Sequence, residues 1–212
     1  QHAFGATVDA IDKWVCPLPS RLQRWLRPLE SRLLHAAHWV VVPTQAGLKR
    51  LAADLAIAAA PSTWQVIGHP VPGLERRTRQ EARSRLGWDP QRVYVVGIGM
   101  FAELKRFPLL IAACARLEHD VQLVLLGEGR EDLLRAAAAE SGLRRPLLTS
   151  ATDDVGLYLS AADVYVSASA TESFGLANLE ALAAGIPAVC TAVDAVPEVV
   201  GDAAVLVEGD AA

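Results

Sequence analysis

Cysteine and long apolar runs are scarce in this sequence, and both absences limit what the protein can be. Its 212 residues include three cysteines, which are odd in number, widely spaced and without the spacing of metal ligands. No apolar run approaches the roughly 20 residues that a membrane-spanning helix needs. The longest run, 93–102, contains two glycines and is typical of a buried strand that leads into a loop. We therefore expect a reduced, cytoplasmic protein.

An excess of basic residues is also missing. Twenty Lys and Arg residues stand against 24 Asp and Glu residues, and the net charge of −4 argues against nucleic acid as a partner. Lysine occurs only at positions 13, 49 and 105, and this preference for Arg, with abundant Ala, hints at a GC-rich bacterial coding sequence. A hydrophobic fraction of 52% with 21% charged residues excludes a disordered chain.

From residue 92 onward, short apolar runs alternate with amphipathic stretches. The runs have the composition of buried parallel strands, at 92–98, 121–126, 146–149, 163–167, 187–191 and 203–207. The stretches between them predict helices, at 107–117, 130–141, 155–161 and 174–184. This alternation predicts an α/β fold, with a Rossmann-like parallel sheet and helices on both faces. Ligands of such sheets bind at the carboxyl ends of the strands.

The first part of the chain is organised differently. A long amphipathic helix is expected over 20–37, followed by a strand at 39–44, a helix at 45–55 and a strand at 63–68. These are too few elements for a complete domain, and the prolines, glycine and polar residues over 69–85 mark a boundary. We expect a remnant of an N-terminal domain over 1–72, a linker over 73–91 and the Rossmann-like domain over 92–212. The chain starts without Met and ends just after an apolar run, so we expect a piece of a longer protein.

The segment 171–187, Thr-Glu-Ser-Phe-Gly-Leu-Ala-Asn-Leu-Glu-Ala-Leu-Ala-Ala-Gly-Ile-Pro, holds the densest chemistry. It places Glu172 and Glu180 eight positions apart. The backbone N–H groups of Ser173, Phe174 and Gly175 are expected at a helix N-terminus, where unpaired donors and the helix dipole favour a diphosphate. An acid at each end suits a ligand with an anionic middle and hydroxylated ends, such as a nucleotide-sugar. Alternatively, Glu172 is a capping acid and Glu180 a solvated helix residue.

Two glycine loops follow the first two strands of the expected sheet. Gly97-Ile98-Gly99 leads to Lys105, a cation just before a helix, and Gly127-Glu128-Gly129 follows the next strand. Glycines let the backbone approach a ligand closely, which makes Gly99, Gly127 and Lys105 candidates for ligand contact. For both loops the alternative is a tight turn between a strand and a helix.

In combination, these segments resemble the nucleotide-sugar-binding domain of the retaining GT-B glycosyltransferases, in particular glycosyltransferase family four. The matching motifs are the Glu172–Glu180 pair around Ser-Phe-Gly-Leu, the run 180–187, the glycine loop ending in Lys105, Leu-Gly-Glu-Gly at 126–129, and Pro197-Glu198. The resemblance covers about residue 93 to the end. It extends more weakly back to about residue 31, where the chain is similar to the last part of the family's N-terminal domain.

The resemblance implies a role for each site residue. Lys105 would neutralise the diphosphate of the leaving nucleotide, Glu172 would bind the donor sugar, and Glu180 would bind the ribose hydroxyls. The amides of Phe174 and Gly175 would contact sugar or phosphate. No metal and no cofactor is implied. The donor would be a UDP- or GDP-linked sugar, and its departing phosphate would deprotonate the acceptor.

The chain departs from the family pattern at several positions. Met100 stands where an Arg is usual, Arg106 where a glycine is usual, Asp194-Ala195 in place of Gly-Gly, and Ala168 in place of a proline. Losing one cation from a partly buried phosphate site would weaken donor binding by about 1–3 kcal/mol, unless Arg106 compensates. Met100 therefore leaves both the donor and the activity open.

We therefore expect a retaining, metal-independent hexosyltransferase, of which this piece would be inactive by itself. The alternatives are a catalytically silent nucleotide-binding module and a GT-B-like epimerase. The acceptor stays open among a glycan, a lipid-linked molecule and a small molecule. The basic helix over 20–37, with Arg21, Arg24, Arg27 and Arg32 beside Trp25, either packs by its apolar stripe or lies on an anionic membrane surface, which would make the protein membrane-associated.

Overall fold

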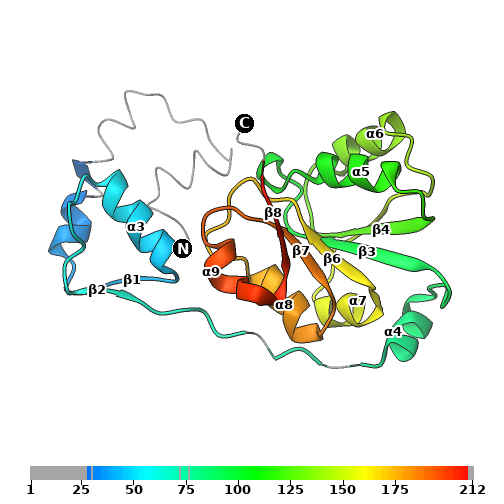
Figure 1. Cartoon of the computed structure of the whole chain (residues 1–212), viewed down its shortest axis with the longest axis horizontal. Helices are drawn as coiled ribbons and strands as arrows, with labels where there is room; N and C mark the ends of the chain where they lie inside the picture. Colours follow the sequence, from blue (N-terminus) through cyan, green and yellow to red (C-terminus); the bar gives the residue numbers. More distant parts are fainter. Residues whose placement is uncertain (1–27, 30, 72, 76, 210–212) are drawn as a thin grey trace.

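Two separate parallel sheets organise the chain (Figure 1). The computed structural model describes residues 28, 29, 31–71, 73–75 and 77–209. In the smaller sheet, β1 (Val40–Val42) pairs with β2 (Trp64–Val66). The larger sheet has six strands in the order β5-β4-β3-β6-β7-β8, all parallel to their neighbours. The predicted α/β fold with a parallel sheet is confirmed.

All six predicted strands are present in the larger sheet. Their bounds are β3 (Val93–Ile98), β4 (Val121–Leu126), β5 (Leu148–Ser150), β6 (Val164–Ser167), β7 (Ala188–Thr191) and β8 (Val205–Val207). The chain builds outward from β3 to β5, then returns to the other side of β3 with β6. The strand order therefore reverses between β3 and β6. Ligands of open α/β sheets bind in the crevice at such a reversal.

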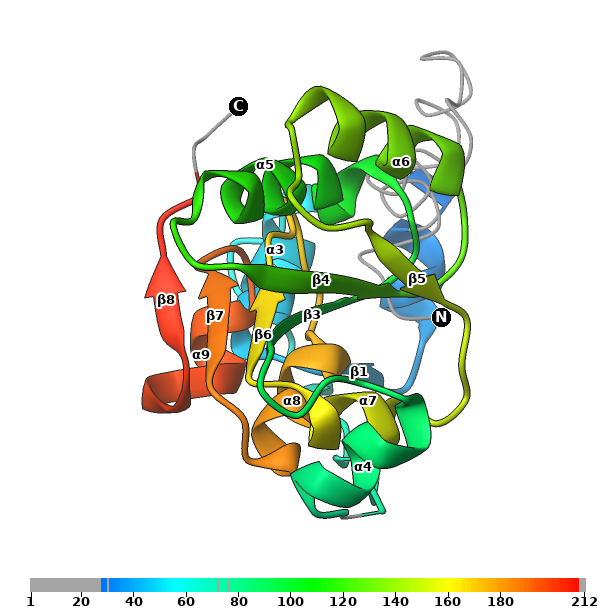
Figure 2. The same cartoon turned by 90° about the vertical axis from the view of Figure 1, so that its right-hand side faces the viewer.

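Helices cover both faces of the larger sheet, as Figure 2 shows. One face carries α5 (Phe107–Arg116) and α6 (Glu131–Glu140), and the other carries α7 (Val155–Ala161), α8 (Leu176–Ala184) and α9 (Val196–Val200). Successive residues of β3 alternate between the two cores: Tyr94 and Val96 pack toward α7 and α8, while Val95 packs toward α5. This double burial explains why the strand sequences are continuously apolar.

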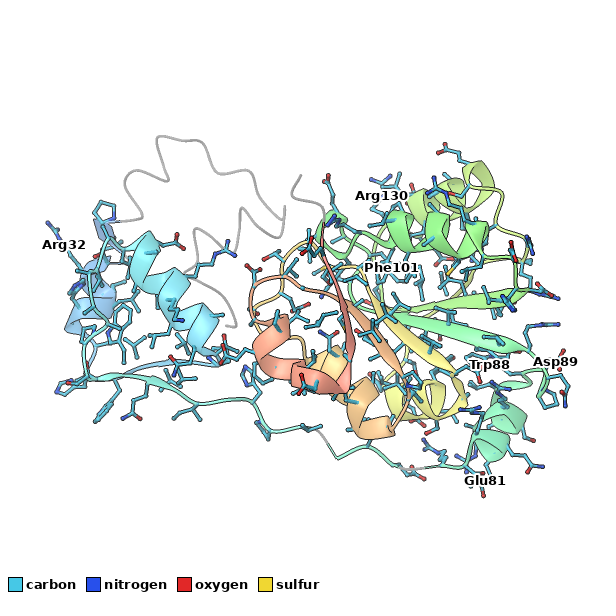
Figure 3. All side chains as sticks on the ribbon, in the orientation of Figure 1. Arg32, Glu81, Trp88, Asp89, Phe101 and Arg130 are labelled. Carbon is cyan, nitrogen blue, oxygen red and sulfur yellow. The ribbon has the colours of Figure 1, made fainter. Side chains whose placement is uncertain are left out.

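Helix α4 (Arg79–Leu86) lies inside the stretch expected as a linker, and the sequence analysis did not predict it. Thr78 and Glu81 form a capping box at its start. Its Arg83 is buried, donates to the carbonyl oxygen of Ala161 at 2.9 Å and pairs with Asp163 at 2.6 Å. The start of the six-stranded region is fixed further by Trp88, which stacks on a buried tyrosine at 4.0 Å between ring centroids (Figure 3).

The two-stranded sheet carries α3 (Gln45–Asp54), which begins at Thr44 as its N-cap. The side chain of Thr44 accepts a hydrogen bond from the amide of Gly47 at 3.0 Å. Of the long helix expected over 20–37, residues 28, 29 and 31–36 are helical, and 20–27 and 30 lie outside the described residues. The basic cluster Arg21, Arg24 and Arg27 and the neighbouring Trp25 therefore lie outside them too. Within the described part of the chain, no helix has the length and apolar character to cross a membrane.

Candidate functional site

Loops at the carboxyl ends of β3, β4 and β6 bring the predicted site residues together. Because β3 and β6 are neighbours at the reversal of strand order, the loop after β3 meets the loop after β6. The amide of Ala170 donates to the carbonyl oxygen of Leu104 at 2.7 Å and so ties the two loops directly. Lys105 and Glu172, 67 positions apart in the sequence, are thereby brought into contact.

Lys105 and Glu172 form an ion pair. The ammonium nitrogen of Lys105 lies 2.6 Å from Oε2 of Glu172. Their side chains are only 19% and 16% exposed, so water screens the pair poorly. A charge-assisted hydrogen bond of this length is strong, and removing either partner would leave the other charge largely desolvated.

The glycines of the first two loops are required by close backbone approach. An added Cβ at Gly127 would lie 1.9 Å from the carbonyl oxygen of Gly99, and at its φ of 150° a side chain is disfavoured as well. At Gly99 an added Cβ would lie 3.0 Å from Cε of Lys105. Gly127 therefore lets the two loops touch, and Gly99 lets the lysine side chain lie across its backbone.

A continued ladder stabilises these loops beyond the ends of the strands. Phe101 forms a parallel bridge with Gly129, and its ring is buried edge-on to that of Phe107 with 5.8 Å between centroids. Arg130, labelled in Figure 3, is exposed. Arg130 pairs with Asp132 on α6, at 2.7 Å. The buried ring of Phe101 and its backbone bridge to Gly129 therefore stabilise these loops.

The start of α8 differs from the prediction. We expected the helix to begin at Phe174, but it begins at Leu176, with Gly175 as its N-cap at a φ of 84°. The left-handed backbone of Gly175 lies outside the helical region, so the regular helix starts after it. The amide group of Asn178 packs against Gly175, because an added Cβ there would lie 2.6 Å from Nδ2 of Asn178. Ser173 and Phe174 therefore belong to the loop before the helix.

Phe174 is buried by the connection that follows the two-stranded sheet. Its ring lies edge-on to His69, with 4.9 Å between centroids. Gly68 also lies against this ring, because a Cβ added there would be 3.9 Å from Cε2 of Phe174. His69 thus packs beside the site loop.

Sequence reasoning missed a buried polar pair beneath the two acids. Tyr165 on β6 donates its hydroxyl to Oδ1 of Asn178 at 2.8 Å. Burial raises the pKa of the Tyr165 hydroxyl well above its ordinary value, and the charges of Cys190, Glu172 and Glu180 raise it further. Both carboxylates therefore lie close enough to Tyr165 for their charges to act on it. Nδ2 of Asn178 is buried without a hydrogen-bond partner among the described residues.

Glu180 lies on the second turn of α8 and is partly buried. Burial raises the pKa of its carboxyl above the ordinary value of 4.5. A pKa raised by burial indicates that the carboxylate has lost hydration and that hydrogen bonds or charges have not replaced it. Perturbed acids in a crevice are candidates for ligand contact.

The departures from the family pattern are placed around this site. Met100 is half exposed at the end of the first loop. The guanidinium of Arg106 lies beside Gly209, after β8, with Nη1 3.8 Å from the position of an added Cβ there. Asp194 follows β7 and accepts a hydrogen bond from the amide of Glu172 at 3.0 Å. Within the described ranges, no group of three or more His, Cys, Asp or Glu side chains could hold a metal ion.

A family model described as glycosyl transferases group 1 matches residues 78–212, more than half of the chain. The match begins at Thr78, the N-cap of α4, and includes the six-stranded sheet and every predicted site residue.

Curated relatives are 35% identical to this chain over the residues that align. Alpha-maltose-1-phosphate synthase of Mycobacterium tuberculosis (strain ATCC 25618 / H37Rv) is 35% identical over 129 residues, which cover 56% of this chain and 33% of the relative. D-inositol 3-phosphate glycosyltransferase of Mycobacterium sp. (strain KMS) is 35% identical over 156 residues, covering 68% and 35%. The chain spans about a third of the length of these relatives.

Solved structures share the fold at lower identity. Sucrose-phosphate synthase from Thermosynechococcus elongatus superposes with a TM-score of 0.76 at 21% identity, over 99% of this chain and 54% of its own. HepE of Anabaena in complex with UDP-glucose gives 0.73 at 19% identity, over 91% and 55%. At these identities the likeness shows the fold alone, and it confirms the GT-B type of architecture that the sequence predicted.

Proposed function

The chain belongs to the family of glycosyl transferases group 1, and from this premise we propose that it forms the donor-binding side of a retaining, metal-independent hexosyltransferase. The observation that carries the proposal is the Lys105–Glu172 pair, at the carboxyl ends of β3 and β6, where the strand order reverses. A cation and a carboxylate, side by side just before the start of α8, suit the diphosphate and the hydroxyls of a nucleotide-sugar. The alternatives of a tight turn and simple capping do not require the two side chains to meet.

Donor binding exchanges the partner of Lys105. A diphosphate carries more charge than one carboxylate, so the ammonium group moves from Glu172 to the phosphate oxygens. Glu172 is then free to accept hydrogen bonds from hydroxyls of the donor sugar. The resting pair keeps both groups desolvated and in place, which lowers the cost of ordering them when the donor arrives.

Glu180 and Asn178 receive the rest of the donor. The partly buried carboxylate of Glu180 accepts hydrogen bonds from the two ribose hydroxyls, and so regains the partners that burial removed. The early amides of α8 favour the negative charge of the phosphates. They lie next to Nδ2 of Asn178, which has no hydrogen-bond partner in the part of the chain that the structure describes.

The reaction needs no nucleophile from the protein. The bond between the anomeric carbon and the phosphate oxygen breaks, and its electron pair leaves with the phosphate. The acceptor oxygen bonds to the same face of the anomeric carbon, and its proton passes to the departing phosphate oxygen. Lys105 stabilises the charge that develops on that phosphate, and this electrostatic stabilisation is the main contribution to catalysis.

A uridine nucleotide is the first donor to test. The structure of HepE holds UDP-glucose, and a structure of TarM from S. aureus holds UDP. Those ligands belong to those proteins, and at such low identity they suggest a probe, with GDP-linked sugars as the second choice. The residues of this chain alone are expected to bind the donor without efficient transfer, because the acceptor side contributes little more than β1, α3 and β2 to the described part of the chain.

A second candidate, a catalytically silent nucleotide-binding module, is favoured by Met100. This half-exposed thioether stands where the family resemblance places an Arg, so the diphosphate has one cation fewer in its loop. Donor hydrolysis or transfer by the full-length protein separates the two candidates. Binding without turnover would favour the silent module.

Calorimetry with UDP and UDP-glucose tests the proposal on the full-length protein. Lys105→Ala and Glu180→Ala should each weaken binding at least about tenfold, because each removes a charged hydrogen-bond partner of the nucleotide. The matched controls are Lys49→Ala and Glu140→Ala, which remove the same charges from exposed positions on α3 and α6. Unchanged affinity in both site variants, for uridine and guanosine nucleotides alike, would sink the proposal.

A further inference from the structure

Asp194 adopts a backbone conformation that its side chain disfavours. Its φ is +45°, and it is one of three non-glycine residues with a positive φ in the part of the chain that the structure describes, with Ala56 and Arg106. Residues persist in such conformations when their surroundings fix them, and they concentrate at functional sites. The contacts of the Asp194 carboxylate show what fixes it here.

One oxygen of this carboxylate holds the loop that carries Glu172. Oδ2 of Asp194 accepts hydrogen bonds from the hydroxyl of Thr171 and from the amide of Glu172, the latter at 3.0 Å. The carbonyl oxygen of Glu172 in turn accepts from the amide of Ala195 at 3.4 Å. The backbone of Glu172 is therefore held on both sides by the loop after β7, and its side chain is directed at Lys105.

The other oxygen reaches the two-stranded region. Oδ1 of Asp194 accepts from Nη1 of Arg50, on α3, at 3.0 Å. The side chains are 33% and 23% exposed, so this ion pair is partly shielded from water. Asp194 is thus the link between a helix of the two-stranded region and the loop that presents Glu172.

A second contact between the same elements aligns α3 with this link. Both carboxylate oxygens of Glu198, on α9, accept from the first amides of α3, from Gln45 at 2.7 Å and from Ala46 at 2.8 Å. A carboxylate at a helix N-terminus satisfies unpaired donors and complements the helix dipole. Figure 1 shows α9 facing the start of α3. Two acids of one loop-and-helix unit therefore hold α3, and one of them also holds the site loop.

We propose that Asp194 is a positioning residue that fixes Glu172 for contact with the donor sugar, and that Arg50 acts on the site through Asp194. This inference rests on the proposed function. It predicts that Asp194 contributes to the binding of the donor sugar more than to the binding of the nucleotide. It also predicts that the position of Glu172 depends on the contact of α3 with Asp194.

Asp194→Gly is the informative variant in the full-length protein, because glycine accepts the positive φ and removes the carboxylate without leaving strain. We expect its Tm to stay within a few degrees of the wild type. Its affinity for UDP-glucose should fall about tenfold, while its affinity for UDP should change less than threefold. Amide hydrogen exchange at Glu172, measured without any nucleotide, should become at least tenfold faster.

Arg50→Ala tests the second step. It should weaken UDP-glucose binding in the wild type and have no additional effect in the Asp194→Gly background. Lys49→Ala, one residue earlier on α3, is the matched control and should change neither affinity. A further loss from Arg50→Ala in the glycine background would overturn the step from Arg50 to Asp194.

The outcomes separate this inference from the proposed function. Equal losses for UDP and UDP-glucose, or unchanged UDP-glucose affinity with unchanged exchange at Glu172, would overturn the positioning role. A wild-type protein that binds no uridine or guanosine nucleotide would overturn the proposed function instead. In that case the exchange rate at Glu172 still decides whether Asp194 positions this loop.

Discussion

The six-stranded sheet and the two-stranded sheet differ in how completely their faces are covered. Helices cover both faces of the larger sheet, and its central side chains, such as Leu123 and Val96, are fully buried. In the two-stranded region the buried cluster consists of Val40, Leu51 and Trp64. Large apolar side chains there stay exposed, with Trp39 at 61%, Ile67 at 56% and Val41 at 55%.

This difference in burial indicates that the two regions are stabilised by different contacts. Burial of apolar surface is the main favourable term in folding, so the larger sheet can be stable through its own two cores. A two-stranded sheet with few buried residues is marginal without packing partners. The contacts of α3 with Glu198 and Asp194 attach this region to the larger one.

Gly127→Ala should have the largest effect and break the six-stranded region. The new Cβ would lie 1.9 Å from a backbone carbonyl oxygen, which no side-chain movement relieves. We expect a loss of more than about 4 kcal/mol in the free energy of unfolding, measured by urea denaturation. Gly142→Ala is the control, because its φ of 67° is also positive but nothing lies within 4 Å of the new Cβ. It should cost only about 1 kcal/mol, and equal costs would contradict this interpretation.

Two leucine truncations, one in each region, should lower the free energy of unfolding by smaller amounts. Leu123→Ala should cost about 3–5 kcal/mol and expose amides throughout the larger sheet, because Leu123 is fully buried in it. Leu51→Ala should cost about 2–3 kcal/mol and act locally, with faster exchange in β1, α3 and β2 only.

Hydrogen exchange resolved by peptide distinguishes local from global opening in these two variants. The amides of β4 report on the larger sheet, and those of β2 report on the smaller one. If Leu51→Ala accelerated exchange in β4 as much as in β2, the two regions would form one cooperative unit, and the contrast between them would fail.

Much of the larger sheet could be predicted because its strands are short apolar runs bounded by glycine, proline and polar residues. The meeting of Lys105 and Glu172 could also be anticipated, since both follow strands of one parallel sheet. Helix α4 was missed because its exposed, charged sequence has little apolar periodicity. Its capping box, Thr78 to Glu81, and Gly87 in the left-handed conformation at its C-cap were the available signals.

Other features depend on contacts that periodicity does not contain. The start of α8 follows from the left-handed conformation of Gly175, packed against the Asn178 amide, and lies two residues after the predicted start. The link from Arg50 to Asp194 spans 144 positions and two different sheets. The sequence shows Asp194 only as a departure from a glycine pair. Its role becomes visible once α3 is placed beside it.

The smallest predicted effect uses pH to separate the two regions. Glu180 belongs to the larger one, and burial raises the pKa of its carboxyl in the folded protein. An acid whose pKa is raised on folding favours the folded state below its unfolded pKa, and this contribution is lost as pH rises through the folded pKa. At pH 7 the charged form therefore costs stability, and Glu180→Gln should raise the Tm. The carboxylate is only partly buried, so the gain should stay below about 4 °C.

The pH series completes this test. The advantage of Glu180→Gln should shrink as the pH falls toward the ordinary carboxyl value of 4.5 and vanish below it, because the wild-type acid is then protonated as well. Glu140→Gln, at an exposed position on α6, should show no such dependence. Glu180→Gln should nevertheless bind UDP more weakly than the wild type, since an amide is a poorer acceptor for the ribose hydroxyls. A gain in stability together with weaker UDP binding would show that the buried charge of Glu180 destabilises the fold but serves ligand binding. A gain in stability that persists at pH 4 would assign the effect to packing alone.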